Sequence, residues 1–182
     1  MVQNTSSILT EMNIEFINSI PEEFKKQTLL ISGTESTKWN NVAYLVLKDH
    51  DTIKKTLEIR FESYCSPFKY IIIQNSLLAI GLQGHFYLYD LLENTSLLVL
   101  EIDGYFGHLY VNENMFYVTG SGSIYCIDEK GNLIWKNCSL GIDGILIERF
   151  SENRIYGSSE CDPPGGWRNF VLDKTTGKLI SN

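Results

Sequence analysis

The chain has 182 residues, of which 43% are hydrophobic and 12% aromatic, a composition typical of a folded domain and not of a disordered chain. Its formal net charge is −7 and no cluster of Lys and Arg stands out, which argues against nucleic acid as a direct partner and favours a basic protein. The polar start of the sequence and the lack of a long apolar run predict neither a signal peptide nor a membrane span, so we expect a cytoplasmic protein.

A short apolar strand that ends in Asp and is followed by a polar turn recurs four times along the chain. The four acidic residues are Asp49, Asp90, Asp128 and Asp173. A period of roughly 40 residues in a β pattern is typical of propeller blades. Because an Asp carboxylate accepts backbone N–H groups at the first position of a turn, we predict that these residues are structural and not catalytic.

The first repeat, at approximately 28–60, is the least regular of the four, and residues 1–27 form an N-terminal segment before it. A short helix is expected in that segment, with Ser19 as its N-cap and acidic residues in its first turn. The stretch from Ser7 to Ile17 fits either a strand or a helical stripe. Strands of this repeat are expected at 14–17, 28–32, 42–49 and 55–60.

The other three repeats, at approximately 69–102, 107–137 and 144–182, each read as four short strands, A to D, separated by turn residues. Their strands are almost continuously apolar, which is expected when both faces of a small sheet are covered. We therefore predict one all-β domain over 1–182, a propeller-like array of three to four four-stranded antiparallel repeats. The array is either a small four-bladed ring or an open half-propeller.

Two segments, residues 123–136 and 169–180, carry a Tyr- or Phe-bearing strand, an Asp, a Gly-containing turn and a second apolar strand. These segments resemble the repeat of pyrroloquinoline-quinone-type propellers and, more distantly in spacing, WD-type repeats. The resemblance implies the architecture. Quinone-binding members use an adjacent Cys–Cys pair and a calcium site, and this sequence has no such pair, so we expect neither the cofactor nor a metal.

Blade topology separates the turns into two rims. The A–B and C–D turns are short and polar, whereas the B–C and D–A loops carry large aromatic and acidic residues. We call the second set the loop rim: residues 35–40, 61–68, 103–107, 137–144 and 160–168. Aromatic residues on loops of a rigid scaffold are typical anchors of protein interfaces. The predicted protein-binding residues are Trp39, Tyr64, Asp103, Tyr105, Phe106, Asp143, Glu160, Asp162, Trp167 and Arg168.

Catalytic patterns are weak in this sequence. His50, His85 and His108 fall in different repeats without metal-binding spacing, and no nucleophile elbow is present. Three functions follow as hypotheses. The first is a non-enzymatic module, in its sharpest form a bacterial immunity protein that neutralises a basic, nuclease-like toxin. The second is a carboxylate-based hydrolase or sugar-active enzyme at the propeller mouth, and the third is a half-propeller completed by another chain.

Overall fold

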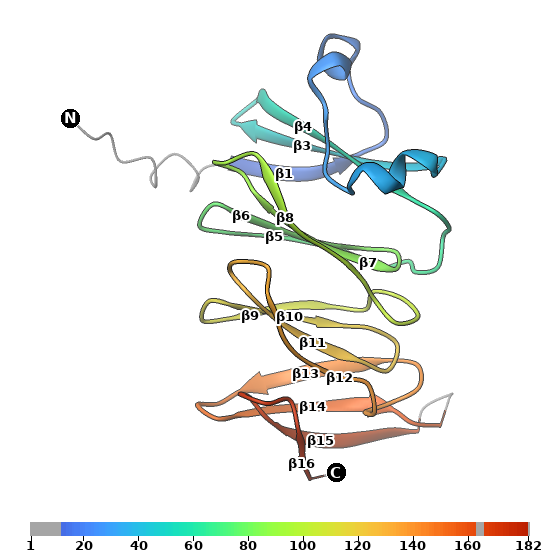
Figure 1. The fold of residues 1–182 in the computed structure, drawn as a ribbon, viewed down its shortest axis with the longest axis vertical. Helices are drawn as coiled ribbons and strands as arrows, with labels where there is room; N and C mark the ends of the chain where they lie inside the picture. The colour runs from blue at the N-terminus through green and yellow to red at the C-terminus, as the bar shows by residue number, and fades with distance from the viewer. Residues whose placement is uncertain (1–11, 163–165, 182) are drawn as a thin grey trace, which may run out of the picture. The chain divides into compact units, whose positions relative to one another are not determined.

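The fold is nearly all β-structure. The computed structural model describes residues 12–162 and 166–181, and within these residues the strands form four four-stranded sheets together with two 3₁₀ helices (Figure 1). This confirms the predicted fold class, a propeller-like array of four-stranded repeats.

Three of the sheets have the simple up-and-down order that the sequence predicts. The second contains β5 (Lys69–Gln74), β6 (Leu77–Leu82), β7 (His85–Asp90) and β8 (Thr95–Glu101). The third contains β9 (Leu109–Asn112), β10 (Met115–Thr119), β11 (Ile124–Asp128) and β12 (Leu133–Asn137). The fourth contains β13 (Ile145–Phe150), β14 (Arg154–Glu160), β15 (Trp167–Asp173) and β16 (Leu179–Ser181).

The first sheet departs from the expected strand order. Its order is β1-β3-β4-β2, built from β1 (Met12–Ile17), β3 (Asn41–Asp49), β4 (Thr52–Phe61) and the two-residue β2 (Leu29–Leu30). The position predicted for the second strand is wrong, because β1 pairs directly with β3 over its whole length and β2 lies at the far edge, parallel to β4. The helical alternative for the chain up to Ile17 is wrong over residues 12–17, and its earlier part lies outside the described residues.

In the segment where a short N-terminal helix is predicted, the structure has a 3₁₀ helix, η3, spanning Glu22–Gln27. Its N-cap position is held by Pro21 and no side chain caps it, so the expected Ser19 cap is wrong. The acidic first turn, Glu22 and Glu23, is present as predicted. With only six residues and no buried side chain, the segment lacks the apolar stripe that stabilises a longer α-helix.

Of the four repeated Asp residues, three accept backbone N–H groups in turns as expected, and Asp49 instead forms an ion pair with Lys54 at 3.4 Å. Each ends a strand, namely β3, β7, β11 or β15. The Oδ1 atom of Asp128 accepts the backbone N–H groups of Lys130 (2.9 Å) and Asn132 (2.7 Å). Asp173 accepts the same kind of bond from Thr176 at 2.8 Å, and Asp90 from Leu92 at 2.8 Å.

The described chain divides into two compact units. The first comprises the residues up to Tyr64 with Ile71–Ala79 and Tyr87–Val99, and the second comprises Cys65–Tyr70, Ile80–Phe86 and the chain from Leu100 onward. In the second unit, the third and fourth sheets pack through a shared apolar core. The core residues are Tyr117, Ile124, Cys126, Trp135, Leu140, Ile145, Ile147, Ile155, Phe170 and Leu172. None of the helices in the described part of the chain has the length and apolar character needed to cross a membrane.

Candidate protein-binding site

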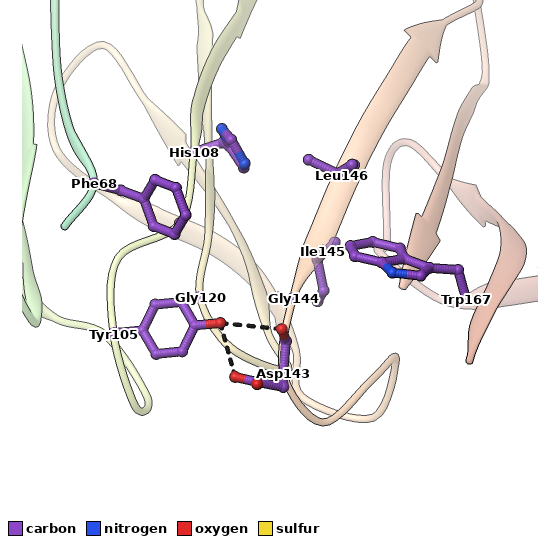
Figure 2. Close-up of a pocket in the computed structure, with 10 residues that line it drawn as sticks. Phe68, Tyr105, His108, Gly120, Asp143, Gly144, Ile145, Leu146 and Trp167 are labelled. Atoms are coloured by element: carbon purple, nitrogen blue, oxygen red, sulfur yellow. Dashed lines mark hydrogen bonds between the residues drawn. The ribbon is translucent and has the colours of Figure 1, made fainter. Parts of the chain in front are cut away.

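An aromatic pocket of about 220 Å³ opens on the loop rim of the second unit, at the ends of strands from different sheets (Figure 2). Phe68 comes from the segment before β5, Tyr105 and His108 from the segment before β9, and Trp167 from the start of β15. The remaining lining residues are Gly107, Gly120, Asp143, Gly144, Ile145 and Leu146. Three residues predicted for binding, Tyr105, Asp143 and Trp167, therefore come together here.

Tyr105 and Asp143, which both line the pocket, are joined by hydrogen bonds (Figure 2). The phenol Oη donates to Asp143, whose backbone oxygen lies at 3.1 Å and whose Oδ1 lies at 2.9 Å. Burial, the hydrogen bond to Asp143 and the charges of Asp143 and Glu160 raise the pKa of Tyr105 to about 12. The phenol is therefore a hydrogen-bond donor throughout the physiological range, and it fixes the Asp143 carboxylate at the pocket.

Trp167 lies against the backbone of Gly144, which explains why this position lacks a side chain. Gly144 has φ of +151°, and a Cβ built there would lie 3.2 Å from Cη2 of Trp167. Its backbone is tied to two loops, because its N–H donates to the oxygen of Ser121 (2.6 Å) and its oxygen accepts the N–H of Glu160 (2.9 Å). Trp167 remains 43% exposed, so this residue is supported on one side and available for contact on another.

Another wall of the pocket is formed by the rings of Phe68 and His108, and Tyr110 continues this row of rings outside the pocket lining. The ring centroids of Phe68 and His108 lie 5.6 Å apart, and those of His108 and Tyr110 lie 6.1 Å apart. Burial lowers the pKa of His108, which favours the neutral imidazole at neutral pH. Phe68 is 45% exposed, so the row ends in an accessible ring face.

Other rim residues of the second unit have different surroundings. Asp103 pairs with Lys136 at 2.5 Å and accepts a bond from Ser123 Oγ at 3.2 Å, and the bond from Lys136 is the main reason why its pKa is lowered. Phe106 is fully buried and is a core residue, so it cannot contact a partner directly. Asp162 and Arg168 are both exposed, and Arg168 lies in β15.

Two predicted residues belong to the first unit. Tyr64 is 74% exposed and makes an edge contact with Phe61, with ring centroids 5.1 Å apart. Trp39 follows the 3₁₀ helix η4 (Thr34–Lys38) as its C-cap residue and is partly buried.

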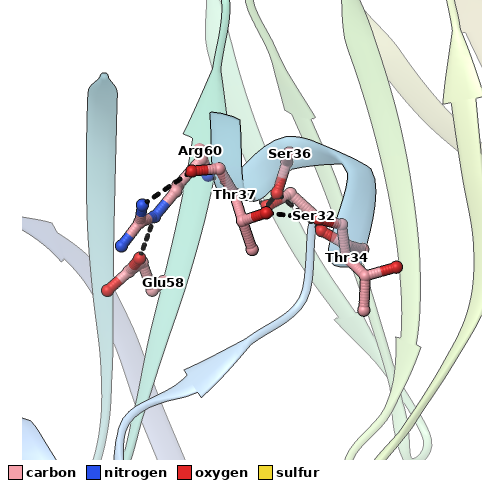
Figure 3. Close-up of polar contacts among 7 residues, drawn as sticks. Ser32, Thr34, Ser36, Thr37, Glu58 and Arg60 are labelled. Atoms are coloured by element: carbon pink, nitrogen blue, oxygen red, sulfur yellow. Dashed lines mark hydrogen bonds and ion pairs between the residues drawn. The ribbon is translucent and has the colours of Figure 1, made fainter. Parts of the chain in front are cut away.

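A polar network ties η4 to β4, as Figure 3 shows. The hydroxyls of Ser32 and Ser36 lie 2.7 Å apart, and the backbone N–H of Arg60 donates to Ser32 Oγ at 3.0 Å. The guanidinium of Arg60 donates to the backbone oxygen of Thr37 and to Glu58. These bonds hold the segment that carries Trp39.

Phe68 and His108 line the pocket although the sequence pattern does not single them out as binding residues. Phe68 ends the rim loop that also contains Tyr64, and His108 is an isolated histidine without a recognisable motif. Both lie directly before the first strand of a repeat, β5 or β9, and this position is the signal they share. Each side chain therefore lies at the N-terminal end of its strand, where the rings of Phe68 and His108 contact each other.

No group of three or more His, Cys, Asp and Glu side chains able to hold a metal ion is found among the residues that the structure describes. Of the four acidic residues that could serve an enzyme, only Asp143 lines the pocket; Asp103, Glu160 and Asp162 are not among its described lining residues.

No known protein-family model matches the sequence, and no curated protein matches it. Solved structures do resemble it in fold. BamB from Moraxella catarrhalis aligns with a TM-score of 0.54 and 18% identity, covering 76% of this chain and 42% of that one. The hydrazine synthase of Kuenenia stuttgartiensis aligns with a TM-score of 0.55 and 11% identity, covering 78% and 42%. The chain thus spans less than half the length of either protein, and the likeness shows that its fold is that of a β-propeller.

Proposed function

We propose that the chain is a non-enzymatic protein-binding module and that the loop rim of its second unit docks a basic protein. The observation that carries the proposal is the aromatic pocket beside the carboxylates of Asp143 and Glu160. Trp and Tyr side chains that are half-exposed on a rigid scaffold are typical binding anchors. The net charge of −7 supports a basic partner, because opposite charges speed encounter and select partners.

The most specific form of this proposal is a bacterial immunity protein that acts in the cytoplasm. Such a protein covers the basic active site of a toxin, for example a nuclease, with an acidic and aromatic surface. The rim offers both kinds of group within one unit, with Tyr105 and Trp167 as anchors and Asp143 as the charge between them.

The placement of the carboxylates favours this function over a carboxylate-based hydrolase, because Asp143 lines the pocket whereas Asp103, Glu160 and Asp162 are not among its described lining residues. A general acid needs a pKa raised toward neutrality. Asp103 has the opposite property, because Lys136 donates to it and lowers its pKa.

A selection from displayed random peptides tests the proposal even though the partner is unidentified. The immobilised wild-type protein should enrich peptides rich in Arg and Lys. A Tyr105→Ala/Trp167→Ala variant should lose this enrichment, whereas a Leu133→Ala/Ile134→Ala variant, which removes exposed apolar side chains from β12, should keep it. Enrichment of acidic peptides, or equal enrichment by both variants, would contradict the proposal.

Co-expression tests the immunity form separately. A toxin encoded beside this gene should arrest growth alone and be tolerated when the wild-type chain is present. If the toxin stays lethal while the two proteins are both produced, the immunity role is wrong, although a different basic partner is still tested by the peptide selection.

A further inference from the structure

We infer that the aromatic pocket receives one cationic side chain, Arg or Lys, of the basic partner. The inference rests on the proposed function and specifies what the pocket of that rim recognises: a cation between aromatic faces, held by Asp143.

The size of the pocket fits a single side chain. Its volume of about 220 Å³ is below the range of about 300–1,000 Å³ that is usual for small-molecule and cofactor sites. A folded partner can insert one long side chain into a space of this size while the surrounding surfaces meet.

The walls suit a cation with an aliphatic stem. Phe68, Tyr105 and Trp167 contribute three aromatic rings, and Figure 2 shows Phe68 and Tyr105 on the opposite side of the pocket from Trp167. A cation near such ring faces is attracted by their quadrupoles, most strongly by Trp. Ile145 and Leu146 provide an apolar wall, along which the methylene groups of Arg or Lys can pack.

The charge in the pocket is negative. Asp143 lines it, and the phenol of Tyr105 uses only the Oδ1 atom of that carboxylate. The charge of Glu160 is also felt at the Tyr105 phenol. No Lys or Arg is among the described residues that line the pocket, and burial favours the neutral form of His108. A cationic side chain of the partner would therefore pair with the negative charge of Asp143 in the pocket.

The test uses three small probes and the wild-type protein: N-acetyl-arginine amide, N-acetyl-lysine amide and N-acetyl-citrulline amide, the last being a neutral isostere of the arginine probe. The readout is the indole N–H signal of Trp167 in ¹H–¹⁵N spectra, identified by its loss in Trp167→Leu. The chain has three Trp residues, so Trp39 and Trp135 serve as internal references.

The two cationic probes should shift the Trp167 signal with saturable, millimolar affinity, and the citrulline probe should not. Asp143→Asn should weaken the binding of the cationic probes by about tenfold, because hydrogen bonds to a charged group are stronger than those to a neutral one. Glu129→Gln removes one exposed carboxylate from the opposite rim and should leave the affinity unchanged.

Equal binding of the citrulline probe, an unchanged affinity in Asp143→Asn, or no shift of Trp167 with any probe would each overturn the inference. The proposed function fails by a different result, namely the loss of basic peptides from the display selection. If basic peptides are still selected through the rim but no probe enters the pocket, the inference is wrong and the rim binds the partner without a cationic side chain in this pocket.

Discussion

Replacing Gly81 by Ala should destabilise the second unit by overpacking, since this position in β6 is filled by the ring of Phe106. A Cβ at residue 81 would lie 2.0 Å from Cε2 and 2.1 Å from Cζ of that ring. The ring cannot easily move away, because it is fully buried and its backbone is fixed: its N–H donates to the oxygen of Gln83 (2.6 Å) and its oxygen accepts the Ser66 hydroxyl (2.8 Å). Overpacking of this kind costs about 1–3 kcal/mol, which corresponds to a fall in Tm of roughly 2–12 °C in a chain of this length.

Thermal unfolding followed by circular dichroism measures this effect, and Gly84→Ala is the matched control. A Cβ at Gly84 would meet only Cys65 Sγ at 3.7 Å and the oxygen of Gly104 at 4.0 Å. The free energy of unfolding of Gly84→Ala should therefore differ from that of the wild type by less than about 0.5 kcal/mol. Adding Phe106→Leu to Gly81→Ala should recover part of the lost stability, because the smaller side chain makes room for the new methyl group. Equal Tm values for the two Gly variants, or no energetic coupling between residues 81 and 106, would refute the explanation.

Three further predictions concern the turns, the fourth sheet and the site. Asp128→Ala should lower the free energy of unfolding by about 1 kcal/mol at pH 7 in urea titrations, because the carboxylate accepts turn N–H groups. Burial opposes the ionisation of Asp128, but the bonds from Asn132 and Lys130 lower its pKa. The stabilisation is therefore complete above the unfolded-state pKa of about 4 and is lost as the pH falls through the folded-state value. A difference between the two proteins that does not shrink on acidification would contradict this. Gly177→Ala should lower the free energy of unfolding by more than about 1 kcal/mol and alter the near-ultraviolet dichroism, since φ is +66° and a Cβ would lie 2.3 Å from Cε3 of Trp135. An unchanged spectrum would count against this contact. In NMR titrations of Tyr-labelled protein, the Tyr105 signal is identified by its absence from Tyr105→Phe, and it should titrate near pH 12. Asp143→Asn should lower the pKa of Tyr105 but keep it above the ordinary value of about 10, because burial is the largest cause of the shift. An unchanged pKa in Asp143→Asn would exclude the contact between the two residues.

Much of the architecture follows from the sequence because its determinants are local. Asp128 and Asp173 accept N–H groups two to four residues ahead, so a short motif carries the whole interaction. The order of the first sheet could not be predicted in the same way. Its β1–β3 pairing joins segments far apart along the chain, and a two-residue β2 leaves no periodic signal.

The candidate site was only partly predictable for the same reason. Tyr105 and Phe106 are adjacent aromatic residues in a loop, where no strand or helix period indicates which one faces solvent. Phe106 is the buried one of the two because Gly81 lacks the Cβ that would occupy the position of the Phe106 ring. Phe68 and His108 become neighbours through tertiary packing, and their individual sequence contexts do not indicate it.

Carboxylates on the loop rim of the second unit are the groups that we propose bind a basic partner. Isothermal titration of one basic peptide from the display selection tests this most directly, with wild-type protein, Asp143→Asn/Glu160→Gln and the matched opposite-rim variant Glu129→Gln/Glu152→Gln. We expect the affinity to fall at least about tenfold in the rim variant, to stay at the wild-type value in the opposite-rim variant, and to weaken for the wild type as salt is raised. Equal affinity in all three proteins, or a larger loss in the opposite-rim variant, would contradict the proposed role of the rim.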